Sequence, residues 1–216
     1  MLLSSPMPND SLRFLKEEAA RLAQENGDLR QDLNALRQSV RALSSLYYVS
    51  QAITPQVDVL RLLSEILDSA LAVLRASDGS LMLRDEDTGE LVFSVVRGAS
   101  ADRLVGYRLP KDQGIAGWAA RERQPQIVRD VRRDPRFYPG VDEAMNFRTR
   151  SMVCVPVHLD DGRVLGVIEV LNKITDDDFT QDDLDLILII AQLAATAMRR
   201  AERAIEMAER DTRSAA

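Results

Sequence analysis

A strict heptad repeat of apolar residues restricts the N-terminal part of the chain to a helix with one apolar seam. Leucine fills every d position of residues 12 to 47: Leu15, Leu22, Leu29, Leu36 and Leu43. The a positions hold Leu12, Ala19, Asn26, Leu33, Val40 and Tyr47. A seven-residue period keeps one seam facing the same way, where a partner helix must cover it. We therefore predict a coiled-coil dimerisation helix over residues 11–43, after a disordered tail at 1–10.

Asn26 indicates how the two helices of such a coiled coil are arranged. A buried amide loses its hydration unless it pairs with its own copy across the seam, and that pairing favours a parallel, in-register homodimer. The alternative is one long amphipathic helix that folds back on its own domain. Ala19 and the helix-weakening Gly27 keep this alternative open.

The composition favours a cytoplasmic protein that binds neither nucleic acid nor a membrane. The chain has 216 residues, 45% of them hydrophobic, which suits one full-size domain with an extension. A net charge of −6 gives no reason to expect nucleic-acid binding. One cysteine excludes an intrachain disulfide, and the N-terminal ten residues lack the pattern of a secretion signal. The richest apolar run, 184–198, is too short and too polar to span a bilayer.

The order of the expected elements indicates an α+β fold, in which an antiparallel sheet is layered with helices. Apolar periodicity predicts a helix that ends near Arg75, a short helix over 114–122 and a final helix over 181–210. A long loop through Pro135 and Pro139 is expected between the last two. Strands are expected over 80–83, 91–96, 107–109, 126–128, 152–157 and 163–171. The last two form the clearest hairpin, joined by the turn Asp160-Asp161-Gly162.

Two motifs carry a resemblance to a known family. One is FY-x-GVD-x-x-x-x-FRTR, from Phe137 to Arg150, and the other is Asn172-Lys173, five residues, Phe179, three residues, Asp183. Together they resemble the GAF domains, specifically those that bind cyclic nucleotides in mammalian phosphodiesterases and bacterial cyclases. The resemblance covers roughly 43–200 and implies a GAF domain with its terminal bundle helices over 44–210, followed by a disordered tail at 211–216.

The resemblance implies a pocket for cAMP or cGMP, with no cofactor besides that ligand. Backbone N–H groups at the start of a short helix would bind the phosphate, because a helix N-terminus attracts anions. Two side chains would meet the base and the ribose-phosphate, and two more would form the floor. The N–H donors would be those of Ile115, Ala116 and Tyr138, the contacting side chains Asp142 and Thr149, and the floor Ser80 and Glu169.

The second motif is expected to brace the pocket rather than to touch the ligand. Its members are Asn172, Lys173, Phe179 and Asp183, and the resemblance implies that the lysine pairs with the aspartate. The residues themselves favour a mostly structural role for this motif, with Phe179 in the core and Thr180 and the following aspartates as a helix N-cap and first turn.

Three positions depart from the family pattern. Met145 stands where the family often has a polar residue, Val96 where it has an aromatic residue that stacks on the base, and Leu184 where it has an acidic residue. These departures bear on affinity and on base preference, and leave the expected phosphate donors in place.

No catalytic or metal-binding pattern is visible in the sequence. Cys154 and His158 lie at one apolar strand without a second metal ligand nearby, and Trp118 reads as a core or pocket-rim anchor. The leading interpretation is therefore a non-enzymatic, dimeric sensor of a small cytosolic ligand, the cyclic nucleotide cAMP or cGMP, that signals to an unknown downstream protein. The alternative is a ligand-independent dimerisation or scaffold module.

Overall fold

A computed structural model of the protein describes residues 13–22, 24–27, 59–99, 101–175 and 177–214. Its internal contacts divide the chain into two units, Met1–Arg41 and Ala42–Ala216. The described part of the first unit, 13–22 and 24–27, is helical, as the heptad predicts. Leu15 and Leu22, at d positions, are 61% and 52% exposed in the single chain. The other d leucines and the tail at 1–10 lie outside the described residues, so the coiled coil stays a prediction.

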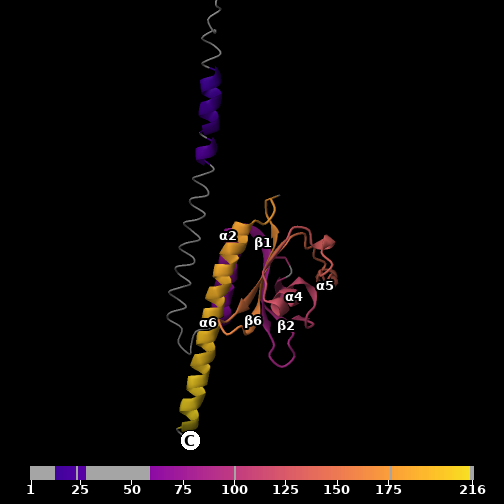
Figure 1. Ribbon diagram of the computed structural model, residues 1–216, viewed down its shortest axis with the longest axis vertical. Coiled ribbons are helices and arrows are strands. Elements are labelled where there is room, and N and C mark those ends of the chain that lie inside the picture. Colours follow the sequence, from indigo (N-terminus) through magenta and orange to yellow (C-terminus); the bar gives the residue numbers. More distant parts are fainter. Residues whose placement is uncertain (1–12, 23, 28–58, 100, 176, 215–216) are drawn as a thin grey trace, which may run out of the picture. The chain divides into compact units, whose positions relative to one another are not determined.

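The second unit is built on a six-stranded antiparallel sheet with the strand order β3-β2-β1-β6-β5-β4 (Figure 1). The strands are β1 Ala76–Arg84, β2 Leu91–Arg97, β3 Arg108–Leu109, β4 Gln126–Val128, β5 Met152–His158 and β6 Val164–Lys173. The α+β fold class and all six predicted strands are thereby confirmed. β1 begins earlier than predicted because 76–79 also pair with β6.

The hairpin of β5 and β6 forms the inner part of the sheet with β1. β5 is buried at every position except His158, and β6 is buried from Val164 to Val170. Strands covered on both faces carry continuous apolar runs rather than an alternating pattern, which explains the sequences of both. Glycine is required at position 166, because a Cβ there would lie 2.1 Å from the backbone oxygen of Met82 on β1.

Two long helices, α2 (Val59–Leu74) and α6 (Gln181–Ser214), cover one face of the sheet, and the main core lies between them and the sheet (Figure 1). α6 begins with a reciprocal cap: the Thr180 hydroxyl accepts from the Asp183 N–H at 3.2 Å, and Asp183 accepts from the Thr180 N–H at 2.8 Å. α6 continues beyond the predicted end at Arg210 into the expected tail, since no glycine or proline stops it there.

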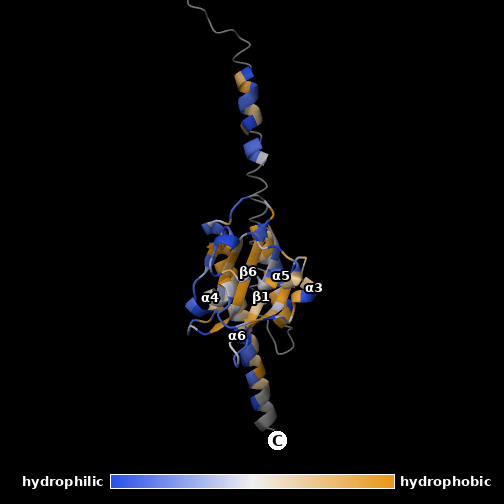
Figure 2. Ribbon diagram, turned by 90° about the vertical axis from the view of Figure 1, so that its right-hand side faces the viewer, coloured by the Kyte–Doolittle hydropathy of each residue, from blue (hydrophilic) through white to orange (hydrophobic). Residues whose placement is uncertain are grey.

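Shorter elements cover the other face: α3 Ala101–Leu104, α4 Gly114–Glu122, the 3₁₀ turn Val131–Arg133 and α5 Gly140–Met145. A second apolar cluster joins them to the sheet, and Figure 2 shows apolar residues gathered on β1 and β6 beneath them. The 3₁₀ turn and α5 lie where the sequence predicted a long loop, which is a correction. Both are too short for a helical period to show, and Pro135 and Pro139 dominate the pattern there.

No helix within the described residues is long and apolar enough to cross a membrane.

Cys154 should behave as a packing residue. It lies on β5 with no exposed surface, and burial raises the pKa of its thiol, as does the nearby charge of Glu169. Cys154→Ala should lower the free energy of unfolding by about 1 kcal/mol, as other small core truncations do. Urea denaturation measures this loss. The wild-type thiol should react with Ellman's reagent only on unfolding, and rapid reaction in the folded protein would contradict the packing role.

Candidate functional site

A pocket lies between the sheet and the short helices α4 and α5, and all seven predicted ligand-binding residues line it. Four elements supply five of them: Ser80 lies on β1, Ile115 and Ala116 on α4, Asp142 on α5 and Glu169 on β6. The other two, Tyr138 and Thr149, lie in the segments just before and just after α5. The space between the protein atoms is about 730 Å³, part of it open to solvent, and the centre of a water molecule reaches about 80 Å³ of it. The smaller figure is the one comparable with cavity volumes, and it lies below the roughly 300–1,000 Å³ of small-molecule sites, so a ligand of nucleotide size has to displace side chains.

Ser80 and Glu169 form the floor, because they are direct partners across the β1–β6 ladder. The Ser80 hydroxyl donates to Glu169 Oε2 at 3.3 Å, and both residues are buried. Burial raises the pKa of Glu169 from 4.5 to about 7; the hydrogen bond from Ser80 opposes this rise and the charge of Asp142 adds to it. A carboxyl poised in this range either donates or accepts a hydrogen bond near neutral pH.

Asp142 and Thr149 are joined to each other at the pocket wall. The Thr149 hydroxyl donates to Asp142 Oδ1 at 2.7 Å, and its backbone N–H donates to Oδ2 at 3.0 Å. Arg132 also donates to Oδ2, at 2.6 Å. Asp142 is therefore a buried carboxylate with three donors, as buried charges require. The sequence analysis missed Arg132, because an Arg-Arg pair in a presumed loop looks like solvated surface.

The N-terminus of α4 supplies the backbone N–H groups that the sequence predicted. Ile115 and Ala116 are buried at the first turn, where N–H groups have no intrahelical partner. Gln113, the N-cap residue, makes no capping hydrogen bond with its side chain. Gly114 has a φ of +72°, so the chain enters the helix by a turn that only glycine adopts readily. This turn of α4 is therefore suited to an anion.

The rest of the wall is mostly apolar, and it includes two of the departures from the family pattern, Val96 and Met145. The third, Leu184, lies in the core on the other face of the sheet. Two charged residues that the sequence analysis missed, Asp78 and Arg97, also line the pocket. Asp78 lies two residues before Ser80 on β1. Because every second residue of a strand faces the same side, the position of Ser80 already predicted that Asp78 faces the pocket.

The second motif makes the contacts expected of a brace. Asn172 accepts from the Arg150 N–H at 2.8 Å and donates to the Arg148 carbonyl at 3.1 Å, so it holds the backbone on both sides of Thr149. Lys173 pairs with Asp183 at 2.7 Å and lies over the ring of Phe179 at 5.7 Å. Phe179 is 1% exposed and belongs to the main core.

The remaining residues singled out in the sequence do not line this pocket. Cys154 is buried, and His158 Nδ1 lies 3.2 Å from the carbonyl oxygen of Leu159. Trp118 packs against the second core cluster beneath the guanidinium of Arg136, at 4.4 Å. The described residues contain no group of three metal-ligating side chains.

The site and the fold define a GAF domain. A family model described as the GAF domain matches residues 58–198, and the chain therefore belongs to the GAF domain family of small-molecule-sensing domains. The dual 3′,5′-cyclic-AMP and -GMP phosphodiesterase 11 of Drosophila melanogaster is 25% identical over 170 residues, which are 73% of this chain and 12% of that protein. Phosphodiesterase 11A of Takifugu rubripes is 27% identical over 96 residues, 44% of this chain and 11% of that protein. The chain thus spans a small part of these relatives.

Solved structures share the fold at low sequence identity. The GAF domain of a phosphoenolpyruvate-protein phosphotransferase from Coxiella burnetii matches with a TM-score of 0.67 and 18% identity, over 79% of this chain and 97% of that one. The free methionine-R-sulfoxide reductase of Neisseria meningitidis matches with a TM-score of 0.63 and 20% identity, over 77% of this chain and 91% of that one. The same fold thus occurs in proteins with different activities.

Glu169 should make stability depend on pH. The pKa of Glu169 is about 7 in the folded protein and ordinarily 4.5, so the folded state holds the proton of this carboxyl more tightly. The stabilisation of the folded state by this proton is fully present below pH 4.5 and is lost as the pH rises through 7. Glu169→Gln should therefore be more stable than wild type at pH 8, by on the order of 3 kcal/mol, with the difference shrinking toward pH 4.5. Urea denaturation across this range measures it, with the exposed Glu143→Gln as control. A difference that does not change with pH would contradict the assignment.

Proposed function

We propose that the protein is a non-enzymatic sensor whose pocket binds a cyclic nucleotide, cAMP or cGMP. The observation that carries the proposal is the meeting of an uncapped helix N-terminus with a buried Asp142–Thr149 pair and a Ser80–Glu169 floor in one pocket. These are the groups that an anionic phosphate, a ribose hydroxyl and a base edge require. The similarity to phosphodiesterase 11 of Drosophila melanogaster, named for cyclic AMP and GMP, supports the same ligand class.

The polar and apolar groups have separate roles in this proposal. The N–H groups of Ile115 and Ala116 receive the phosphate, and the apolar wall that includes Val96 and Met145 receives the base. Thr149 and Asp142 hydrogen-bond the ligand at the cost of part of their bonding to each other. In this proposal the site binds its ligand without transforming it. The carboxyls of Glu169 and Asp142 are tied to Ser80 and Thr149, and Cys154, which neighbours Glu169 in the sheet, is fully buried and does not line the pocket.

A ligand-independent scaffold is the second candidate, and two observations favour it. Val96 replaces an aromatic residue that would stack on the base, and Met145 stands where the family often has a polar residue. Asp142 already has three hydrogen-bond donors without any ligand. In either case we propose that the output passes to a partner protein through a parallel homodimer. The exposed Leu15 and Leu22 on the N-terminal helix support the dimer, because exposed leucines at heptad spacing require a covering helix.

Pocket variants test the ligand. Asp142→Ala and Thr149→Ala should each weaken cAMP or cGMP binding by about 1–3 kcal/mol, because each leaves a ligand polar group buried without a partner. Titration calorimetry measures this, and the ligand should raise the melting temperature with the logarithm of its concentration. Glu143→Ala, an exposed change on the same helix, is the matched control. Absence of heat and of any melting shift at millimolar cAMP, cGMP or cyclic dinucleotide would exclude the nucleotide and leave the scaffold.

Light scattering tests the dimer. The full chain should be a homodimer at micromolar concentration, and Asn26→Leu should stabilise the assembly while loosening its orientation or its oligomeric state, because it removes the polar residue that fixes the register. Removal of residues 1–40 should weaken the dimer without unfolding the remaining unit. A monomeric full chain at these concentrations would overturn the proposal.

A further inference from the structure

A second hollow in the same unit, which we call the basic hollow, lies at the ends of several strands. Its walls are the end of β1, the start of β2, the segment before α4, the second half of α4 and the turn before β6. The space between the protein atoms is about 860 Å³, part of it open to solvent, and the centre of a water molecule reaches about 360 Å³. It shares no lining residue with the first pocket.

The charge of this hollow is opposite to that of the chain. Five of its lining residues are cations, Arg84, Lys111, Arg121, Arg123 and Arg163, and one, Asp112, is a carboxylate. The whole chain has 28 basic and 34 acidic residues, so the hollow is a local concentration of positive charge. Like charges that converge on one concave space repel one another, and a bound anion relieves that repulsion.

Three of these cations have no carboxylate partner among the described residues. Within the part of the chain that the structure describes, Arg84, Lys111 and Arg123 make no ion pair, whereas Arg121 pairs with Glu122 at 2.8 Å. Arg163 is held by Glu86 and Glu202. Three cations on three different segments are thus available to a ligand.

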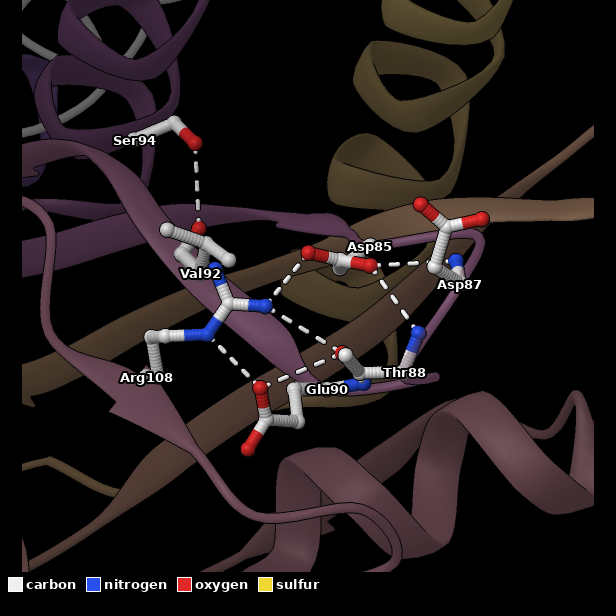
Figure 3. A network of polar contacts seen from close by, with 7 residues as sticks. All are labelled: Asp85, Asp87, Thr88, Glu90, Val92, Ser94 and Arg108. Carbon is white, nitrogen blue, oxygen red and sulfur yellow. Dashed lines mark hydrogen bonds and ion pairs between the residues drawn. The ribbon is translucent and has the colours of Figure 1, made fainter.

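Two acidic residues of the adjacent β1–β2 turn, Asp85 and Glu90, are bound by Arg108, while Glu86 of the same turn pairs with Arg163 of the hollow. Figure 3 shows Arg108 of β3 bound to Asp85 and to Glu90, the latter at 2.6 Å. Asp85 also accepts from the N–H of Thr88 at 3.0 Å, and the hydrogen bond from Arg108 is the main reason that the pKa of Asp85 falls to about 2. This network fixes the turn that follows Arg84 and contains Gly89, and it directs the carboxylates of Asp85 and Glu90 to Arg108.

Arg123 has a backbone conformation that favours glycine. It is the C-cap of α4 in the left-handed conformation, with φ +57° and ψ +35°, where glycine is the preferred residue. Its guanidinium lies against Gly162, where an added Cβ would be 2.7 Å from Nη1. A long cation thus occupies a conformation that is unfavourable for it, and a glycine opposite leaves room for its head group. Such an outlier is a reason to look for a function.

We propose that the basic hollow binds a soluble small molecule that carries two or more linked phosphates. Arginine forks and a lysine ammonium from separate segments fit a multiply charged phosphate chain, which accepts several hydrogen bonds at once. Leu91, Ala120 and Val164 provide an apolar wall for the rest of such a molecule. The proposal does not depend on a ligand in the first pocket.

Calorimetric titration of the full chain with inorganic triphosphate tests this site. We expect binding that weakens as the salt concentration rises, because the contacts are ionic. Arg84→Gln with Arg123→Gln should weaken binding about tenfold or more. The matched control, Arg129→Gln with Arg133→Gln, removes the same charge from exposed positions outside the hollow and should change affinity less than about twofold.

Arg123→Gly separates a binding role from a structural one. Glycine suits the left-handed C-cap, so this variant should have a higher melting temperature than wild type and yet bind triphosphate more weakly. Equal losses in the two double variants would show unspecific attraction and overturn the proposal. So would the absence of heat at millimolar triphosphate in low salt, or unchanged affinity in Arg123→Gly.

Discussion

The pairing of β1 with β6 in the middle of the sheet is the constraint on which the site depends. Its register sets Ser80 beside Glu169, and both strands are covered on their two faces. The approach is close: a Cβ at Gly79 would lie 2.8 Å from the carbonyl oxygen of Glu169. One face of this ladder supports the main core under α2 and α6, and the other is the pocket floor. The free energy that stabilises the fold therefore also fixes the floor.

The wall opposite the floor is held differently, by polar contacts. Asn172, at the end of β6, binds the backbone on both sides of Thr149, and Thr149 in turn binds Asp142 of α5. Net contributions of such bonds to stability are about 1 kcal/mol each, because water offers replacements. The polar groups of a ligand can replace these hydrogen bonds in the same way. A floor held rigidly by the sheet and a wall fixed by exchangeable hydrogen bonds are well matched to reversible binding.

The sequence predicted the parts of the fold that show an apolar pattern along a strand or helix, or a helix-capping residue. The hairpin of β5 and β6 has a continuous apolar run around Asp160-Asp161-Gly162, and α6 has its N-cap at Thr180. α5 was missed because six residues show no period. For the site, the resemblance to the cyclic-nucleotide-binding GAF domains implied the seven residues that line the pocket, but not that Arg132 reaches Asp142, because that contact depends on a 3₁₀ turn. The basic hollow was invisible for the same reason: its cations come from segments that only the fold brings together.

The hydrogen bonds already present limit what the first pocket can accept. A carboxylate has about four acceptor positions, and Asp142 uses three of them, so a ligand donor takes the last one or displaces Thr149 or Arg132. Glu169 is neutral below a pH of about 7 and then offers one donor from the floor. Water reaches only about 80 Å³ of the pocket, so a nucleotide-sized ligand must also move side chains aside. Binding thus exchanges existing contacts for new ones, and the net affinity depends on how completely a ligand's own groups replace them.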